Sequence, residues 1–157
     1  MQGTPGVLQR LTAAVVAETR SALQYEIHAA LLDNWGLAKL AEHERGEAEE
    51  ERGHRRRFMD RITLMGGDLD VGAIGAPRVG ASVPELLTAD LALEREAVAV
   101  YSEAALYCRN DARDLVSAAL FESILADEEG HVNWLGTQLA AIDQFGLSLY
   151  LSRAFKV

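Results

Sequence analysis

The segment Glu51-Arg52-Gly53-His54 returns in related form as Glu128-Glu129-Gly130-His131. In an α-helix, residues three apart project from one face about one turn apart, so the glutamate and histidine of each segment point the same way. Another acid precedes each segment: Glu18 lies 33 residues before the first glutamate and Glu94 lies 34 residues before the second. The chain therefore contains two copies of one plan, in which a carboxylate is followed after a long gap by Glu-x-x-His.

Together the two copies offer four carboxylates and two imidazoles. This donor set suits a dinuclear iron or manganese site, whereas zinc more often takes thiolates and the chain has only Cys108. Burying four unpaired carboxylates would cost many kcal/mol, but two divalent cations would neutralise them and leave both imidazoles neutral. The pattern predicts a di-metal site built from Glu18, Glu51, His54, Glu94, Glu128 and His131.

Helix geometry assigns roles within this set. Glu51 and Glu128, each one turn from a histidine, are expected to bridge the two ions from opposite sides. The other ligands are expected to complete the coordination of one ion each. Glu18 and His54 would bind one ion, and Glu94 and His131 would bind the other.

Three further residues are candidates to hydrogen-bond the ligands. Tyr25 and Tyr101 each fall seven residues, about two turns, beyond the first acid of their half, and each is expected to reach the carboxylate of the opposite half. The alternative is that both are ordinary core tyrosines of amphipathic helices. Asp90, one turn before Glu94, is a candidate to orient His54.

Apolar residues recur at steps of three and four in four segments, which predicts four long helices. The first begins at Pro5 behind an N-cap at Thr4, and the third begins at residues 82–84 and carries its stripe to Cys108. Residues 66–83, with five glycines, predict a crossover along the bundle. Residues 147–157 predict a short fifth helix. We therefore expect an all-α, up-down-down-up four-helix bundle forming one domain over residues 1–157.

The charge, the apolar content and the cysteine count of the chain limit which partners and which cellular location are expected. A formal net charge of -9 argues against nucleic acid as a partner, and Arg55-Arg56-Arg57 is interpreted as a solvated or subunit-facing surface. No apolar run approaches the roughly 20 residues that span a bilayer, so no membrane is expected. One cysteine and an N-terminus without a signal pattern favour the cytoplasm. Trp134 and Cys108 are interpreted as packing residues.

Beyond the predicted ligands, five segments resemble the bacterioferritins, a ferritin-like family known for this ligand pattern. They are Gln24-Tyr25, His28-Ala29, Asn34-Trp35-Gly36-Leu37, Asp90-Leu91-Ala92-Leu93-Glu94 and Asp127-Glu128-Glu129-Gly130-His131. The resemblance implies a ferritin-like bundle in a hollow shell of about 24 subunits. It also implies that the six ligands form a ferroxidase centre, which oxidises Fe(II) with dioxygen or hydrogen peroxide and stores the product as a ferric mineral.

One departure from the family concerns haem. Bacterioferritins place a haem-ligating methionine where this chain has Arg52, and arginine cannot act as a thioether ligand to haem iron. Thr19, Glu26 and Glu49 make the same face polar. We expect a haem-free subunit in which Arg52 forms ion pairs across the subunit interface with Glu26 or Glu49.

Two other family features are replaced, an inner-surface histidine by Gly46 and a tyrosine near the site by Phe58. Neither is a metal ligand, so these changes are expected to affect electron transfer or refilling of the site rather than oxidation. Three alternatives remain open: co-assembly with a haem-bearing sister chain, a purely structural shell subunit, and a peroxide-reducing di-iron protein of the rubrerythrin type. The last usually needs Cys-x-x-Cys pairs, which this sequence lacks.

Overall fold

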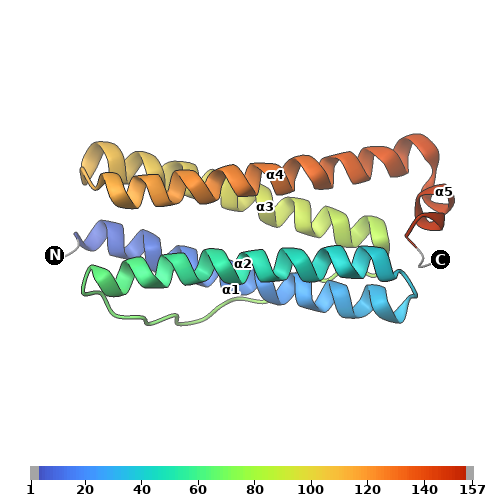
Figure 1. Ribbon diagram of the computed structural model, residues 1–157, viewed down its shortest axis with the longest axis horizontal. Helices are drawn as coiled ribbons and strands as arrows, with labels where there is room; N and C mark the ends of the chain where they lie inside the picture. Colours follow the sequence, from blue (N-terminus) through green and yellow to red (C-terminus); the bar gives the residue numbers. More distant parts are fainter. Residues whose placement is uncertain (1–3, 155–157) are drawn as a thin grey trace.

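The computed structural model describes residues 4–154, which form four long helices and a short fifth one (Figure 1). The elements are α1 (Pro5–Asn34), α2 (Ala38–Leu64), α3 (Val83–Leu106), the π-helical turn η1 (Tyr107–Asp111), α4 (Leu115–Phe145) and α5 (Leu147–Ser152). The expected all-α bundle is confirmed. None of the helices within residues 4–154 is long and apolar enough to cross a membrane.

The bundle consists of two helix pairs, α1 with α2 and α3 with α4, each joined by a short connection (Figure 1). Between the pairs, an extended segment of residues 67–80 runs back along α1 and α2, so α2 and α3 point the same way. This is the predicted crossover. The backbone N–H of Arg78 donates to the side-chain oxygen of Gln24 at 3.0 Å, which attaches the crossover to α1.

The helix starts follow the predicted signals. Thr4 and Ser82 are extended at the N-caps of α1 and α3, and a proline lies in the first turn of each helix. The start of α4 has a cap that the sequence analysis did not identify, since the Asp114 side chain accepts the N–H of Ser117 at 3.0 Å.

Two helix ends differ from expectation. The third helix was expected to remain regular to Cys108, but α3 ends at Leu106 and η1 buries the cysteine. The wider turn lets the chain reverse into α4, with the N–H of Asp114 donating to the carbonyl of Cys108 at 2.8 Å. The fifth helix ends at Ser152, earlier than predicted, and residues 155–157 lie outside the described part of the chain.

The apolar core is divided into two clusters, one toward each end of the bundle. One is built around Leu11, Phe58 and Phe121, and the other around Leu32 and Leu87. Each fully buried side chain of this size stabilises the fold by about 1.5–3 kcal/mol. Both clusters therefore support a middle section that is buried but polar.

The tight contact between the crossover and α3 provides a test of this packing. A Cβ added at Gly80 would lie 2.5 Å from the backbone nitrogen of Leu86, whereas one added at Gly46 would meet no atom within 4 Å. We expect Gly80→Ala to destabilise the subunit by about 1–3 kcal/mol, because the backbone of α3 must move. Gly46→Ala, in an open helical position, should stabilise it by about 1 kcal/mol.

Calorimetry would measure both effects as shifts of about 2–4 °C in the thermal midpoint per kcal/mol. An unchanged midpoint in Gly80→Ala would contradict the packing of the crossover on α3.

Candidate metal centre

All six predicted ligands meet in the buried middle of the bundle. They come from all four long helices, with Glu18 on α1, Glu51 and His54 on α2, Glu94 on α3, and Glu128 and His131 on α4. None is more than 9% exposed. Each helix alone would present an acid on its apolar stripe, so the centre forms only when the two halves of the bundle pack together.

The six residues divide into two groups whose ligand atoms lie within 4.8 Å of one another. One group is Glu18, Glu51, His54 and Glu128, and the other is Glu51, Glu94, Glu128 and His131. Glu51 and Glu128 belong to both groups, which is the arrangement expected of bridging carboxylates. The structure thus assembles the residues as the sequence predicts, and their binding of metal remains a prediction.

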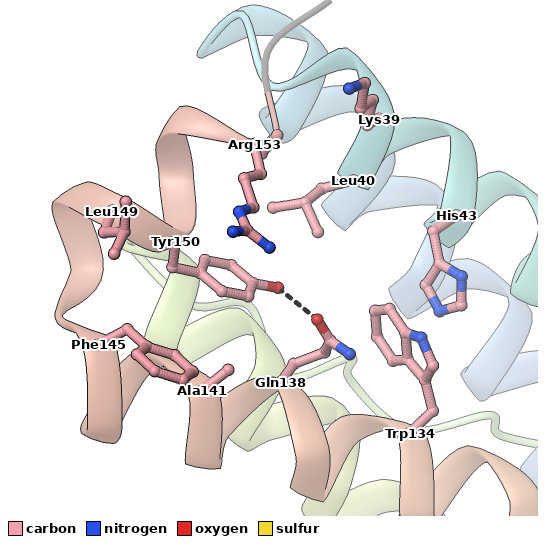
Figure 2. Close-up of a pocket in the computed structure, with 11 residues that line it drawn as sticks. Lys39, Leu40, His43, Trp134, Gln138, Ala141, Phe145, Leu149, Tyr150 and Arg153 are labelled. Carbon is pink, nitrogen blue, oxygen red and sulfur yellow. Dashed lines mark hydrogen bonds between the residues drawn. The ribbon is translucent and has the colours of Figure 1, made fainter.

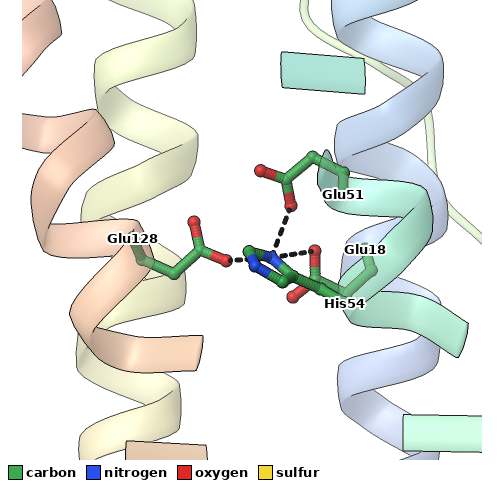
Figure 3. Close-up of side chains that lie close together, drawn as sticks. All are labelled: Glu18, Glu51, His54 and Glu128. Atoms are coloured by element: carbon green, nitrogen blue, oxygen red, sulfur yellow. Dashed lines mark ion pairs between the residues drawn. The ribbon is translucent and has the colours of Figure 1, made fainter. Parts of the chain in front are cut away.

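The first group surrounds one nitrogen of His54 with carboxylates (Figure 3). Nδ1 lies 3.2 Å from Oε1 of Glu128, 3.6 Å from Oε2 of Glu51 and 3.9 Å from Oε2 of Glu18. All of these side chains point into the space between the helix pairs. One imidazole nitrogen and three carboxylate oxygens therefore converge there.

The second group repeats this pattern around His131. Its Nδ1 lies 3.2 Å from Oε2 of Glu128, 3.3 Å from Oε1 of Glu51 and 3.5 Å from Oε1 of Glu94. Glu51 and Glu128 thus each present one oxygen to each histidine. The two imidazole rings are 6.3 Å apart between centroids, which leaves the shared carboxylates between them.

Tyr25 and Tyr101 each donate a hydrogen bond to a carboxylate on the other helix pair, as the two-copy pattern predicts. The Tyr101 hydroxyl donates to Oε1 of Glu18 at 2.5 Å, and the Tyr25 hydroxyl donates to Oε1 of Glu94. Both tyrosines are almost fully buried, so these bonds hold the terminal carboxylates in a fixed orientation.

The predicted role of Asp90 is wrong. Asp90 does not orient His54, because its carboxylate is bound by Gln24 and His28. Asp127 contacts His54 instead, with its Oδ2 3.2 Å from Nε2. Asp90 lies one turn before Glu94 on α3, whereas His54 lies one turn after Glu51 on α2. Because α2 and α3 point the same way, the two residues lie on opposite sides of the centre along the bundle.

Sequence reasoning also missed the residues behind His131. Its Nε2 lies 3.1 Å from Oε2 of Glu47 and 3.5 Å from Oε2 of Glu50. The positions of these residues in the sequence could have indicated their role. Asp127 directly precedes Glu128, and Glu47 lies one helical turn before Glu51. Both histidines therefore have carboxylates facing both ring nitrogens, which fixes their orientation.

The centre has the chemistry of a cation site. Five buried atoms within it have no hydrogen-bond partner, namely Oε1 of Glu51, both oxygens of Glu128, and Nδ1 of His54 and of His131. Unpaired lone pairs of this kind are costly in a protein interior, and a cation would satisfy them together. Carboxylate and imidazole donors suit iron or manganese. The residues therefore fit the di-metal centre predicted from sequence.

Without metal, the histidines hold protons. Burial opposes a charge on His54, but the carboxylates of Glu128 and Glu51 outweigh it and raise its pKa to about 10. The pKa of His131 is also raised, since the carboxylates of Glu128, Glu51 and Glu94 outweigh burial. Both imidazoles are therefore cationic at neutral pH and partly balance the four acids.

The pKa values of the four glutamates are shifted in different directions by burial and by their neighbours. Burial raises the pKa of Glu18 and of Glu94 well above the usual range, and neighbouring acids add to the effect. Burial acts in the same direction on Glu128, but the nearby histidines dominate and lower its pKa. Burial also acts on Glu51, but hydrogen bonds with Glu18 and both histidines lower its pKa. The terminal acids thus tend to hold protons, while the two acids shared by both groups stay ionised.

The face that carries Arg52 is occupied by ion pairs. Nε and Nη2 of Arg52 donate to Oε2 of Glu49 at 3.0 and 2.6 Å, and Nη1 donates to Glu26. The sequence predicts these partners but expects the pairs to cross a subunit interface. They form within one chain, because Glu49 lies one turn before Arg52 and Glu26 faces it from α1. An adjacent cavity of about 690 Å³ is lined by Arg52, Arg55 and Arg56 together with the apolar side chains of Met59, Val71 and Ile74.

The remaining predicted positions are structural. Phe58 packs against Tyr101 and Phe121, with ring centroids 5.5 and 5.0 Å away. Trp134 stacks on His43 at 3.6 Å between centroids, in agreement with its interpretation as a packing residue. Gly46 is exposed and offers no side chain to a metal.

Comparison with known proteins gives a consistent result. Residues 8–145 match the ferritin-like domain family. The chain is 39% identical to a bacterioferritin of Mycolicibacterium paratuberculosis over 96% of its own length and 94% of the relative's. It is 39% identical to a bacterioferritin of Rhodobacter capsulatus, covering 93% and 90% of the two chains. The solved structure of Mycobacterium tuberculosis bacterioferritin BfrA superposes with a TM-score of 0.96 at 37% identity, covering 99% of this chain and 98% of that one.

The protonation of the centre predicts how metal affinity depends on pH. His54, with a pKa of about 10 in the metal-free protein, carries a proton at neutral pH that a bound cation must displace. The affinity for Zn(II), a redox-inert probe, should therefore rise between about pH 6 and 8, by about tenfold per pH unit for each proton displaced. Titration calorimetry in two buffers of different ionisation enthalpy would count the released protons. An affinity that stays flat over this range would contradict the assignment.

Proposed function

The chain belongs to the bacterioferritins, and from this premise we propose that its six clustered side chains bind a pair of Fe(II) ions and oxidise them for storage. Iron storage with ferroxidase activity is the function of the family. The observation that supports the residue assignment is the sharing of Glu51 and Glu128 between two groups of potential ligands. A pair of carboxylates common to both groups is what holds two cations side by side.

The charge of the centre supports the same assignment. Two Fe(II) ions would balance the charges of Glu18, Glu51, Glu94 and Glu128, and the two histidines would become neutral ligands as their protons leave. Iron supplies the redox chemistry, because each Fe(II) gives up an electron to dioxygen or hydrogen peroxide. The protein supplies the geometry and the electrostatic balance.

The residues around the ligands would control how far the centre can deform. Tyr101 and Tyr25 hold Glu18 and Glu94, and each bond connects one half of the bundle to the other. Asp127 restrains His54 from the side opposite the bridging acids. We infer that these contacts keep the ligand positions nearly constant when the charge of the bound iron changes.

The shell is also part of the proposal. We propose that about 24 copies of this single-domain chain assemble into a closed hollow shell, in which the oxidised iron accumulates as a mineral. Family membership supports an oligomeric shell. Co-assembly with a haem-bearing sister chain would supply the haem that this subunit is expected to lack.

The residue assignment is tested by iron oxidation kinetics. Stopped-flow mixing of Fe(II) with metal-free protein should give a fast absorbance rise that saturates at about two Fe(II) per subunit. Glu51→Ala should slow this phase at least about 10–100-fold, because both iron positions lose a shared ligand. The matched control is Glu42→Ala, an exposed acid on the same helix, which should leave the rate unchanged. Unchanged kinetics in Glu51→Ala would refute the assignment.

We also propose that this subunit binds no haem. Arg52 stands at the family's haem-ligand position and is engaged by Glu49 and Glu26, so the face presents ion pairs rather than a thioether. Burying an apolar porphyrin there would require desolvating these charges.

Absorption spectroscopy tests this proposal. Protein purified from haem-supplemented cells should show no Soret band, and Arg52→Met should gain one, since a thioether becomes available. Arg52→Lys serves as the control, because it also disturbs the ion pairs but provides no ligand. Wild-type protein containing about half a haem per subunit, one per pair of subunits, would overturn the proposal.

A further inference from the structure

A second group of potential ligands lies in the bundle apart from the di-metal centre. It consists of His28 on α1, Glu44 on α2 and Asp90 on α3, which bring ligand atoms within 4.8 Å of one another. Their exposed fractions are 0%, 1% and 0%. None of the three belongs to the six residues of the di-metal centre. A polar group this deeply buried needs a partner for each of its polar atoms.

Asp90 is held in place by hydrogen bonds from two neighbouring side chains. Nδ1 of His28 lies 3.0 Å from both of its carboxylate oxygens, and the Gln24 amide donates to Oδ1 at 2.7 Å. The other end of that amide accepts the backbone N–H of Arg78 from the crossover. Asp90 and His28 are therefore held in place before any ligand arrives, which reduces the entropy cost of binding one.

Two atoms of the group have no partner. Nε2 of His28 and Oε2 of Glu44 are buried and make no hydrogen bond in the described part of the chain. A buried donor or acceptor without a partner destabilises the folded protein. Burial, and then the carboxylate of Asp90, raise the pKa of Glu44 well above its usual range. Two carboxylates therefore face each other in the interior with one imidazole beside them.

We propose that His28, Glu44 and Asp90 form a third, mononuclear site for a divalent cation such as Mn(II), Zn(II) or Fe(II). One such ion balances the two carboxylates and leaves the imidazole neutral, so the filled site carries no net charge. Mixed imidazole and carboxylate donors suit borderline divalent metals. Because the ligands come from three helices, the ion connects α2 to α3 through the interior and stabilises the bundle by linkage.

A cavity lies beside the segment of α2 that precedes Glu44 (Figure 2). It has a volume of about 470 Å³ and lies between α2, α4 and α5, with Leu40, His43, Trp134 and Tyr150 among its walls. Burial, and then the carboxylate of Glu44, raise the pKa of the Tyr150 hydroxyl to about 12. Leu40 and His43 lie within one turn of Glu44 on α2. Lys39 and Arg153 line the cavity and Glu44 does not, so the cavity itself is not a site for the cation.

The test counts bound Co(II), a spectroscopic probe that is stable in air, on the assembled metal-free protein. Equilibrium dialysis should show about one Co(II) per subunit fewer in Glu44→Gln than in wild type. The matched control is Glu42→Gln, which makes the same charge change at an exposed position two residues away on α2 and should bind as wild type does. Glu51→Ala, which damages the di-metal centre, should retain the extra ion, so a failure at one centre is distinguishable from a failure at the other.

Equal stoichiometry in Glu44→Gln and wild type would overturn the proposal, and Glu44 would then be buried as a protonated acid against Asp90. Crystals of wild-type protein soaked in Co(II) give a second measurement that does not depend on the folding of the variant. An anomalous peak at the cobalt edge between His28, Glu44 and Asp90 supports the site. A map without such a peak refutes it.

Discussion

Repulsion among acids in a dry interior is the constraint on which this structure depends. Glu18, Glu51, Glu94 and Glu128 are each no more than 1% exposed and lie around a common space. Their mutual repulsion and the loss of hydration would disrupt the bundle unless positive charge were placed among them. In the metal-free protein, protons on His54 and His131 supply positive charge, and protons on Glu18 and Glu94 remove negative charge. Cations are the better partner, because they also satisfy the unpaired oxygens.

The bundle tolerates this polar middle because its ends are apolar. The two hydrophobic clusters pack all four long helices on either side of the centre and hold the carboxylates at a fixed separation. Tyrosines from each half then brace acids of the other half. The burial of apolar side chains at the two ends thus offsets the free-energy cost of placing the carboxylates close together. Such compensation is common at sites that bind a charged ligand. Two bound cations, as proposed above, would relieve the repulsion that folding creates.

Arg52 determines the chemistry of one face of the bundle. The TM-score of 0.96 to BfrA indicates that the backbone is preserved. The face near Arg52 nevertheless presents a guanidinium held between two carboxylates of its own chain. These pairs are partly exposed, so they add little stability, and their main effect is to make the face polar.

The helices, the crossover and the six residues of the centre could be predicted from the amino-acid sequence. Each depends on a local rule: apolar spacing for the helices, a run of glycines for the crossover, and a spacing of three for Glu51 with His54 and Glu128 with His131. The partners of Asp90, the contact of Asp127 with His54 and the pairing of Arg52 within one chain became evident only from the packing of the helices. The physical reason is that periodicity specifies which face of a helix a residue occupies, whereas its partner depends on the rotation and offset of the neighbouring helix.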